Sequence, residues 1–169
     1  CRPARVGELV NVHSHAEPNR VRVTHVSLDL ALDFDRRQAE GSVRLDLDRM
    51  DRNAPLVLDA RALEILSVTG SAGGKRKYVL GVEDPVIASP LIIELAPTDE
   101  SVTVHYRTTQ GAEAMQWLAP EQTAGGKQPF LFTQGQAILT RTWIPLQDSP
   151  GVRVTYDAIC AGVPGGALP

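Results

Sequence analysis

The chain has 169 residues, a length that fits one domain with a hydrophobic core of its own. Hydrophobic residues make up 43% of it and charged residues 22%, and these proportions exclude a largely disordered chain. The formal net charge is -3 with both signs interspersed, which gives no reason to expect a nucleic-acid partner. No apolar run is long enough for a transmembrane helix, so no transmembrane segment is expected.

The two cysteines, Cys1 and Cys160, lie near opposite ends of the chain and lack the spacing of a zinc knuckle or a disulfide framework. The sequence starts at Cys1 without a methionine, as a trimmed chain would, or a mature bacterial lipoprotein whose first cysteine carries lipid. We expect a cytoplasmic protein, with the bacterial envelope as the alternative. The excess of arginine over lysine favours a GC-rich bacterial source.

Residues 1–20 show little periodicity and contain Pro3 and Pro18, so we expect an irregular lead-in. His13 and His15 lie two apart within it. On an extended segment such a pair points both imidazoles to one side, where ligands from elsewhere could complete a metal site. No acidic residue or cysteine accompanies them at a recognisable spacing, so no metal ligation is predicted.

From residue 21 onward the sequence alternates apolar and polar residues with a period of two, the pattern of half-buried strands. A polar turn at 33–37 separates two such segments and predicts an antiparallel hairpin, with His25 on its polar, solvent-facing side. No segment keeps a helical period over three turns, so the chain is predicted to be all-β. Further strands are expected at 56–59, 63–68, 78–82, 91–95 and 102–106.

The segment 111–128 breaks this rhythm, and we interpret it as a long loop packed by Trp117. It leads into the stretch 129–156, where two apolar runs, 130–132 and 152–156, flank a glutamine-rich centre. No packing rule requires such a polar centre, and centres of this kind tend to face a ligand.

Motifs in this stretch and before it follow a fixed order. The run Thr133-Gln134-Gly135-Gln136 is followed by Arg141, Trp143, Ile144, Pro145, Gln147, Asp148, Ser149, Pro150 and Gly151. Earlier segments agree in the same order: His13-Ser14 before Pro18, Val21-Arg22-Val23-Thr24-His25, Leu28-Asp29-Leu30, Asp33-Phe34-Asp35, Gly41-Ser42-Val43, Leu56-Val57-Leu58-Asp59, and Gln116-Trp117-Leu118 with Pro120-Glu121-Gln122-Thr123. Together they resemble the N-terminal domain of the M1 zinc aminopeptidases, in the leukotriene A4 hydrolase branch.

The resemblance extends from about Val12 to Ala158. It implies an all-β domain at 21–158 with a saddle-like mixed or antiparallel sheet, capping the active-site cleft of a metallopeptidase. It also implies that the glutamine loop reaches the catalytic domain and lines the pocket for the first residue of a peptide substrate.

Substrate binding is thereby assigned to Gln134, Gly135 and Gln136. Each glutamine amide offers an acceptor oxygen and two N–H donors, which suits the free amine or a backbone carbonyl of a peptide. Many family members carry a glutamate where this chain has Gln136, and a neutral amide gives a weaker bond to an ammonium group. The alternative is a polar loop that binds no ligand.

Four residues that match the family pattern are expected to support the loop: Arg141, Pro145, Asp148 and Pro150. No catalytic or metal-binding residue is expected in this chain, because the H-E-x-x-H helix of the family is absent and none of the four histidines begins one. The resemblance places zinc and the general base in a separate catalytic domain of the parent aminopeptidase. The chain by itself is therefore predicted to be inactive.

Residues 159–169 depart from the family pattern, in which an apolar strand continues past Ala158. They form a Pro/Gly-rich tail that is unsuited to a central strand. We therefore expect a truncated C-terminal end or a change of reading frame near Ile159.

The alternative to the N-terminal domain of an aminopeptidase is a stand-alone, non-catalytic β-sandwich interaction module.

Overall fold

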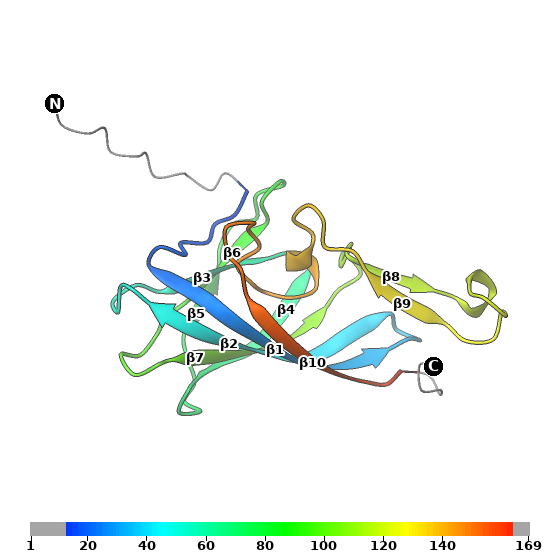
Figure 1. The fold of residues 1–169 in the computed structure, drawn as a ribbon, viewed down its shortest axis with the longest axis horizontal. Helices are drawn as coiled ribbons and strands as arrows, with labels where there is room; N and C mark the ends of the chain where they lie inside the picture. The colour runs from blue at the N-terminus through cyan, green and yellow to red at the C-terminus, as the bar shows by residue number, and fades with distance from the viewer. Residues whose placement is uncertain (1–12, 164–169) are drawn as a thin grey trace.

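The computed structural model describes residues 13–163, and its elements confirm the predicted all-β class (Figure 1). Two single-turn 3₁₀ helices, η1 (Pro120–Gln122) and η2 (Thr140–Thr142), interrupt the strands. The strands in chain order are β1 (Val21–Asp33), β2 (Gln38–Arg49), β3 (Leu56–Ala60), β4 (Leu63–Gly70), β5 (Tyr78–Leu80), β6 (Ser89–Ile93), β7 (Ser101–Thr108), β8 (Met115–Leu118), β9 (Phe130–Thr133) and β10 (Thr155–Ala161).

The larger sheet has five strands in the order β10-β1-β2-β7-β4. Its neighbours are antiparallel except for β1 and β10, which run parallel, so the sheet is mixed as the resemblance implied. The β1–β2 hairpin forms because apolar residues alternate along both strands. A register shift between Val23 and His25 moves the alternation by one residue, so that Val21 and Val23 face inward together with Val26 and the leucines after it.

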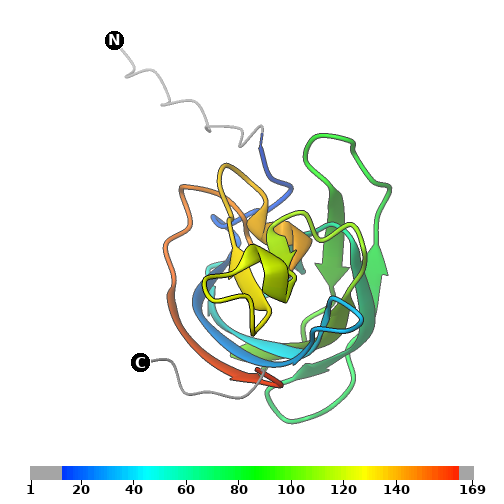
Figure 2. The same cartoon turned by 90° about the vertical axis from the view of Figure 1, so that its right-hand side faces the viewer.

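The smaller sheet has three strands in the order β3-β6-β5, and it covers the inner face of the larger sheet. Every residue of β3 is buried, including the carboxylate of Asp59. Figure 2 shows the curved strands of the larger sheet with the segment that follows β9 on their concave side. The fold thus places the glutamine-rich stretch where it can be held by both sheets.

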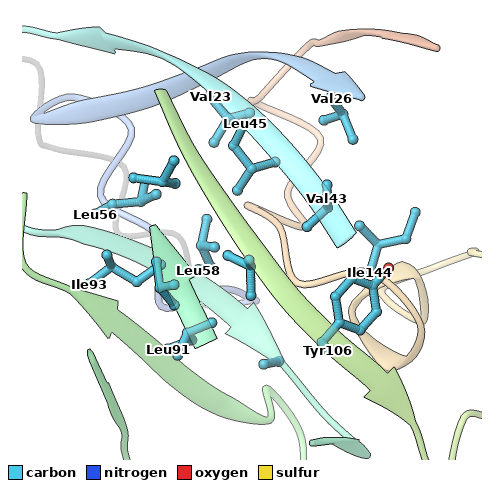
Figure 3. Close-up of a cluster of buried hydrophobic side chains, with 14 of the residues drawn as sticks. Val23, Val26, Val43, Leu45, Leu56, Leu58, Leu91, Ile93, Tyr106 and Ile144 are labelled. Atoms are coloured by element: carbon cyan, nitrogen blue, oxygen red, sulfur yellow. The ribbon is translucent and has the colours of Figure 1, made fainter. Parts of the chain in front are cut away.

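The core lies between the two sheets, where inward-facing side chains of both meet (Figure 3). Leu45 and Val43 of β2 face Leu58 of β3 and Leu91 of β6, and all four are fully buried. Full burial of such side chains contributes about 1.5–3 kcal/mol each. Ile144, which follows η2, joins the same cluster and ties the glutamine-rich stretch to the core.

The expected loop at 111–128 is wrong in part, because it contains strand β8 and helix η1. Strand β8 pairs with β9 in an antiparallel hairpin that lies at one end of the molecule (Figure 1). Trp117 does pack this segment: its ring meets Phe34 edge-on, with centroids 5.0 Å apart and an interplanar angle of 88°. A four-residue strand is too short to show a period in the sequence.

The last strand also differs from the expectation. Residues 152–154 are irregular, and β10 starts at Thr155 and continues three residues beyond Ala158, to Ala161. Its partner is β1, and His25 bridges the pair through Thr155 Oγ1 at 2.7 Å and Asp157 Oδ1 at 2.9 Å. The expectations for Cys1, for most of the lead-in and for the end of the tail fall on residues 1–12 and 164–169, which lie outside the described residues.

Candidate functional site

The candidate loop, residues 134–139, joins the end of β9 to η2. The side chains of Gln134 and Gln136 are exposed, and Gly135 is half-buried. The loop is not extended. A turn begins at Gln136, closed by a hydrogen bond from Leu139 N to Gly135 O at 2.9 Å, and the peptide bond from Gln136 to Ala137 is cis.

The two glutamines differ in what their amides do. Gln134 folds back on the loop, and its Oε1 accepts the backbone N–H of Gln136 at 3.1 Å. The side chain of Gln136 makes no hydrogen bond within the described residues, so both ends of its amide face solvent. Gln134 therefore shapes the loop, whereas the amide of Gln136 is available to a ligand.

One end of the loop is fixed through Thr142, which is fully buried. Its hydroxyl donates to Leu139 O at 2.7 Å and accepts the N–H of Ala114 at 3.0 Å. The carbonyl of Ala114 in turn accepts the N–H of Gln134 at 2.9 Å. Both ends of the loop are thus connected through one buried residue pair, Ala114 and Thr142.

The second anchor is Arg141, whose side chain is 1% exposed. Its guanidinium donates to three backbone carbonyls, those of His13, Ile87 and Asp148, at 2.7–2.8 Å. Its Nε and its backbone N–H both donate to Asp148 Oδ2, at 3.2 and 3.1 Å. These hydrogen bonds hold the segment after the loop, which contains Asp148, against two other parts of the chain, at His13 and at Ile87.

The two prolines of the predicted support set lie in different surroundings. Pro145 is buried between Ile144 and the residues that contact β3, where its fixed backbone angle suits an irregular segment. Pro150 is exposed in a turn closed by Val152 N and Ser149 O at 3.0 Å. Both restrict the backbone that follows the loop.

Comparison with known proteins shows the family of this domain. Residues 22–160 match the family model described as the Peptidase M1 N-terminal domain. The chain belongs to this family. The leucine aminopeptidase 2 of Yarrowia lipolytica is 35% identical over 158 residues, which are 92% of this chain and 24% of that protein. The yeast LTA4 hydrolase structure superposes with a TM-score of 0.84 at 30% identity, covering 94% of this chain and 25% of that one.

This M1 N-terminal domain therefore spans about a quarter of the length of the relatives it matches. An M1 zinc metallopeptidase from Deinococcus radiodurans shares the fold with a TM-score of 0.59 at 17% identity, covering 83% of this chain and 32% of that one. The resemblance read from the motifs is confirmed by these matches. In residues 13–163 no helix has the length and apolar character needed to cross a membrane.

The sequence reasoning missed the buried polar cluster beside the loop of the M1 domain. Asp59 is 0% exposed, and its carboxylate accepts Ser14 Oγ at 2.5 Å, His15 N at 2.8 Å and Asp148 N at 3.1 Å. Burial raises the pKa of the Asp59 carboxyl, and these hydrogen bonds with the nearby Arg141 charge oppose that rise. The sequence shows only an aspartate at the end of an apolar run, Leu56-Val57-Leu58-Asp59, and nothing in it indicates the partners of that carboxylate.

The histidine pair of the lead-in does not form a metal site in the described residues. His15 Nε2 lies 3.1 Å from Ala88 O, and His13 contributes its carbonyl to Arg141. Within residues 13–163 no three histidine, cysteine, aspartate or glutamate side chains are arranged to hold a metal ion. The residues of this structure therefore do not fit the zinc ion of the M1 peptidases.

Proposed function

We propose that this chain is the N-terminal substrate-cleft domain of a leukotriene A4 hydrolase-like zinc aminopeptidase, and that its Gln134–Gln136 loop binds the N-terminal end of peptide substrates. Membership of the M1 family supports this, as does the name of the Yarrowia lipolytica relative, a leucine aminopeptidase. The observation that carries the proposal is the exposed amide of Gln136, on a loop whose two ends are fixed by buried contacts.

A fixed loop suits recognition because the bound geometry exists before the ligand arrives, and less entropy is lost on binding. The Oε1 of Gln136 would accept a hydrogen bond from the substrate ammonium. The Nε2 of Gln134 would donate to a substrate carbonyl, since only its Oε1 is used within the loop. Gly135 would let the substrate backbone approach.

The roles of the remaining residues follow from their contacts. Arg141, Pro145, Asp148 and Pro150 hold or restrict the segment after the loop. The zinc ion and the general base would come from the catalytic domain of the parent enzyme, which is the expected partner of this domain. No step of peptide hydrolysis is assigned to a residue of this chain.

The test is steady-state kinetics of the full-length enzyme that carries this domain, with a Gln136→Ala substitution. A hydrogen bond to a charged group contributes about 1.5–3 kcal/mol, so kcat/KM should fall by about tenfold or more while zinc content is unchanged. The matched control is Gln128→Ala, another exposed glutamine, on the loop before β9. Equal kcat/KM for both variants and the wild type would refute the binding role.

A further inference from the structure

Asp59 is the penultimate residue of β3, and four donor groups surround its carboxylate. Ser14 Oγ, His15 N and Asp148 N donate to its two oxygens, and Arg141 Nη2 lies 3.7 Å from Oδ2. The Ser14 hydroxyl accepts the N–H of Ala16 at 3.0 Å, so its single proton points to Asp59. A carboxylate is the one side chain of this size that can accept from all of these groups.

Backbone contacts join the same segments. Asp59 N donates to Leu146 O at 2.8 Å, and Leu146 N donates back to Asp59 O at 3.3 Å. Arg61 N donates to Arg141 O at 3.0 Å. The segment after the loop therefore runs along the end of β3, and the Asp59 side chain fastens both of them to the lead-in at Ser14 and His15.

From Asp59 the contacts continue to the glutamine loop. Asp148, held through its N–H by Asp59, accepts the backbone N–H and the Nε of Arg141. Arg141 is followed directly by Thr142, whose hydroxyl holds Leu139 at one end of the loop. The same hydroxyl holds Ala114, whose carbonyl accepts the N–H of Gln134 at the other end. Each of these contacts is buried or part-buried. A movement of the Asp59 side chain therefore shifts the groups packed against it.

We infer that Asp59 is a positioning residue for substrate recognition: it sets the place of the Gln134–Gln136 loop through Asp148 and Arg141. This inference rests on the function proposed for that loop. Asp59 is fully buried and touches no substrate, so its effect on turnover must pass through the loop. No other acidic side chain within the described residues connects the lead-in, β3 and the segment after the loop.

The substitution Asp59→Asn removes the negative charge and one of the two acceptor oxygens of the side chain while keeping its shape. An asparagine keeps one acceptor oxygen and turns an NH₂ group toward groups that are themselves donors. Such a mismatch in a buried site is relieved by movement, and the movable partners are Ser14, Asp148 and Arg141. The milder substitution Ser14→Ala removes one donor and leaves the carboxylate in place.

The experiment is a double-mutant cycle on kcat/KM of the full-length enzyme, with Asp59→Asn and Gln136→Ala. Asp59→Asn alone should lower kcat/KM by at least about threefold at unchanged zinc content. In the Gln136→Ala background it should change kcat/KM by less than about twofold, since the loop has already lost its contact. The positioning role would be overturned if the losses in kcat/KM of the two single variants multiplied in the double variant. It would also be overturned if Asp59→Asn alone caused no loss. An unaffected Gln136→Ala enzyme would overturn the proposed function of the loop instead.

A second cycle keeps the test decisive if the Asp59→Asn enzyme does not fold. Ser14→Ala replaces Asp59→Asn in it and should show a smaller loss that again disappears in the Gln136→Ala background. The control is Ser27→Ala, which removes a serine–aspartate hydrogen bond of 3.0 Å to Asp157, on the pair β1–β10. This control should leave kcat/KM unchanged. Equal effects of Ser14→Ala and Ser27→Ala on kcat/KM would contradict the inference.

Discussion

Gly135 and Thr140 lie so close together that no side chain fits between them. A Cβ atom added at Gly135 would stand 2.3 Å from Thr140 Oγ1 and 3.5 Å from Thr140 Cβ. The glycine is thus required by the hydroxyl of Thr140, whose Cβ alone would be in ordinary contact. This pair sets how tightly the loop turns between β9 and η2.

The first prediction follows from this pair. Gly135→Ala should lower kcat/KM of the full-length enzyme by several-fold, because Thr140 or the loop must move to relieve the contact. Adding Thr140→Ala removes the Oγ1 atom and should restore most of the activity. Steady-state kinetics of the two single variants and the double variant check this. A double variant no more active than Gly135→Ala would show that another contact requires the glycine.

The second prediction concerns Thr142, which holds both ends of the loop. Thr142→Val keeps the shape and leaves the buried N–H of Ala114 without an acceptor, at a cost of about 1–3 kcal/mol in the free energy of unfolding. Urea unfolding of the chain measures it. The control Thr103→Val changes a strand threonine whose side chain makes no hydrogen bond with residues 13–163, and its effect should stay within about 0.5 kcal/mol. Equal effects would contradict the assigned role of Thr142.

The third prediction concerns pH and the Asp99–Arg76 pair, away from the loop. Hydrogen bonds from Arg76 at 2.6 and 2.8 Å hold the pKa of the buried Asp99 carboxyl below its usual range. A lowered folded-state pKa contributes stability that is present above the ordinary value of about 4 and is lost as pH falls through the folded-state pKa.

Asp99→Asn should therefore lower the free energy of unfolding at pH 7, and the difference from the wild type should shrink as the pH falls below about 4. Urea unfolding at a series of pH values measures this difference. A difference that stays constant from pH 7 to pH 3 would show that the loss comes from packing rather than from the charge of Asp99.

The parts of the fold with a strong local pattern could be predicted from the sequence. The alternation along β1 and β2 identified the hairpin, because one face of it packs on the core and the other meets solvent. Strand β8 was missed because four residues cannot establish a period. The end of β10 was placed too early, since an exposed edge strand has no apolar face to mark it.

The candidate site shows the same limit. The contact of Arg141 with Asp148 could be expected because the two lie seven residues apart around a turn. The cluster around Asp59 could not, because its partners Ser14 and Asp148 are 45 and 89 residues away and only the folded sheets bring them together. The assignment of substrate binding to Gln134, Gly135 and Gln136 stays a prediction.

The measurement that tests this assignment most directly compares two competing peptides on the full-length enzyme, one with a free N-terminal amine and one acetylated there. Inhibition constants are determined for the wild type and for Gln136→Ala. Loss of the Gln136 acceptor should raise the inhibition constant of the free-amine peptide by about tenfold and change that of the acetylated peptide by less than about twofold. An equal rise in the inhibition constants of both peptides, or a rise in neither, would contradict recognition of the substrate amine by this loop.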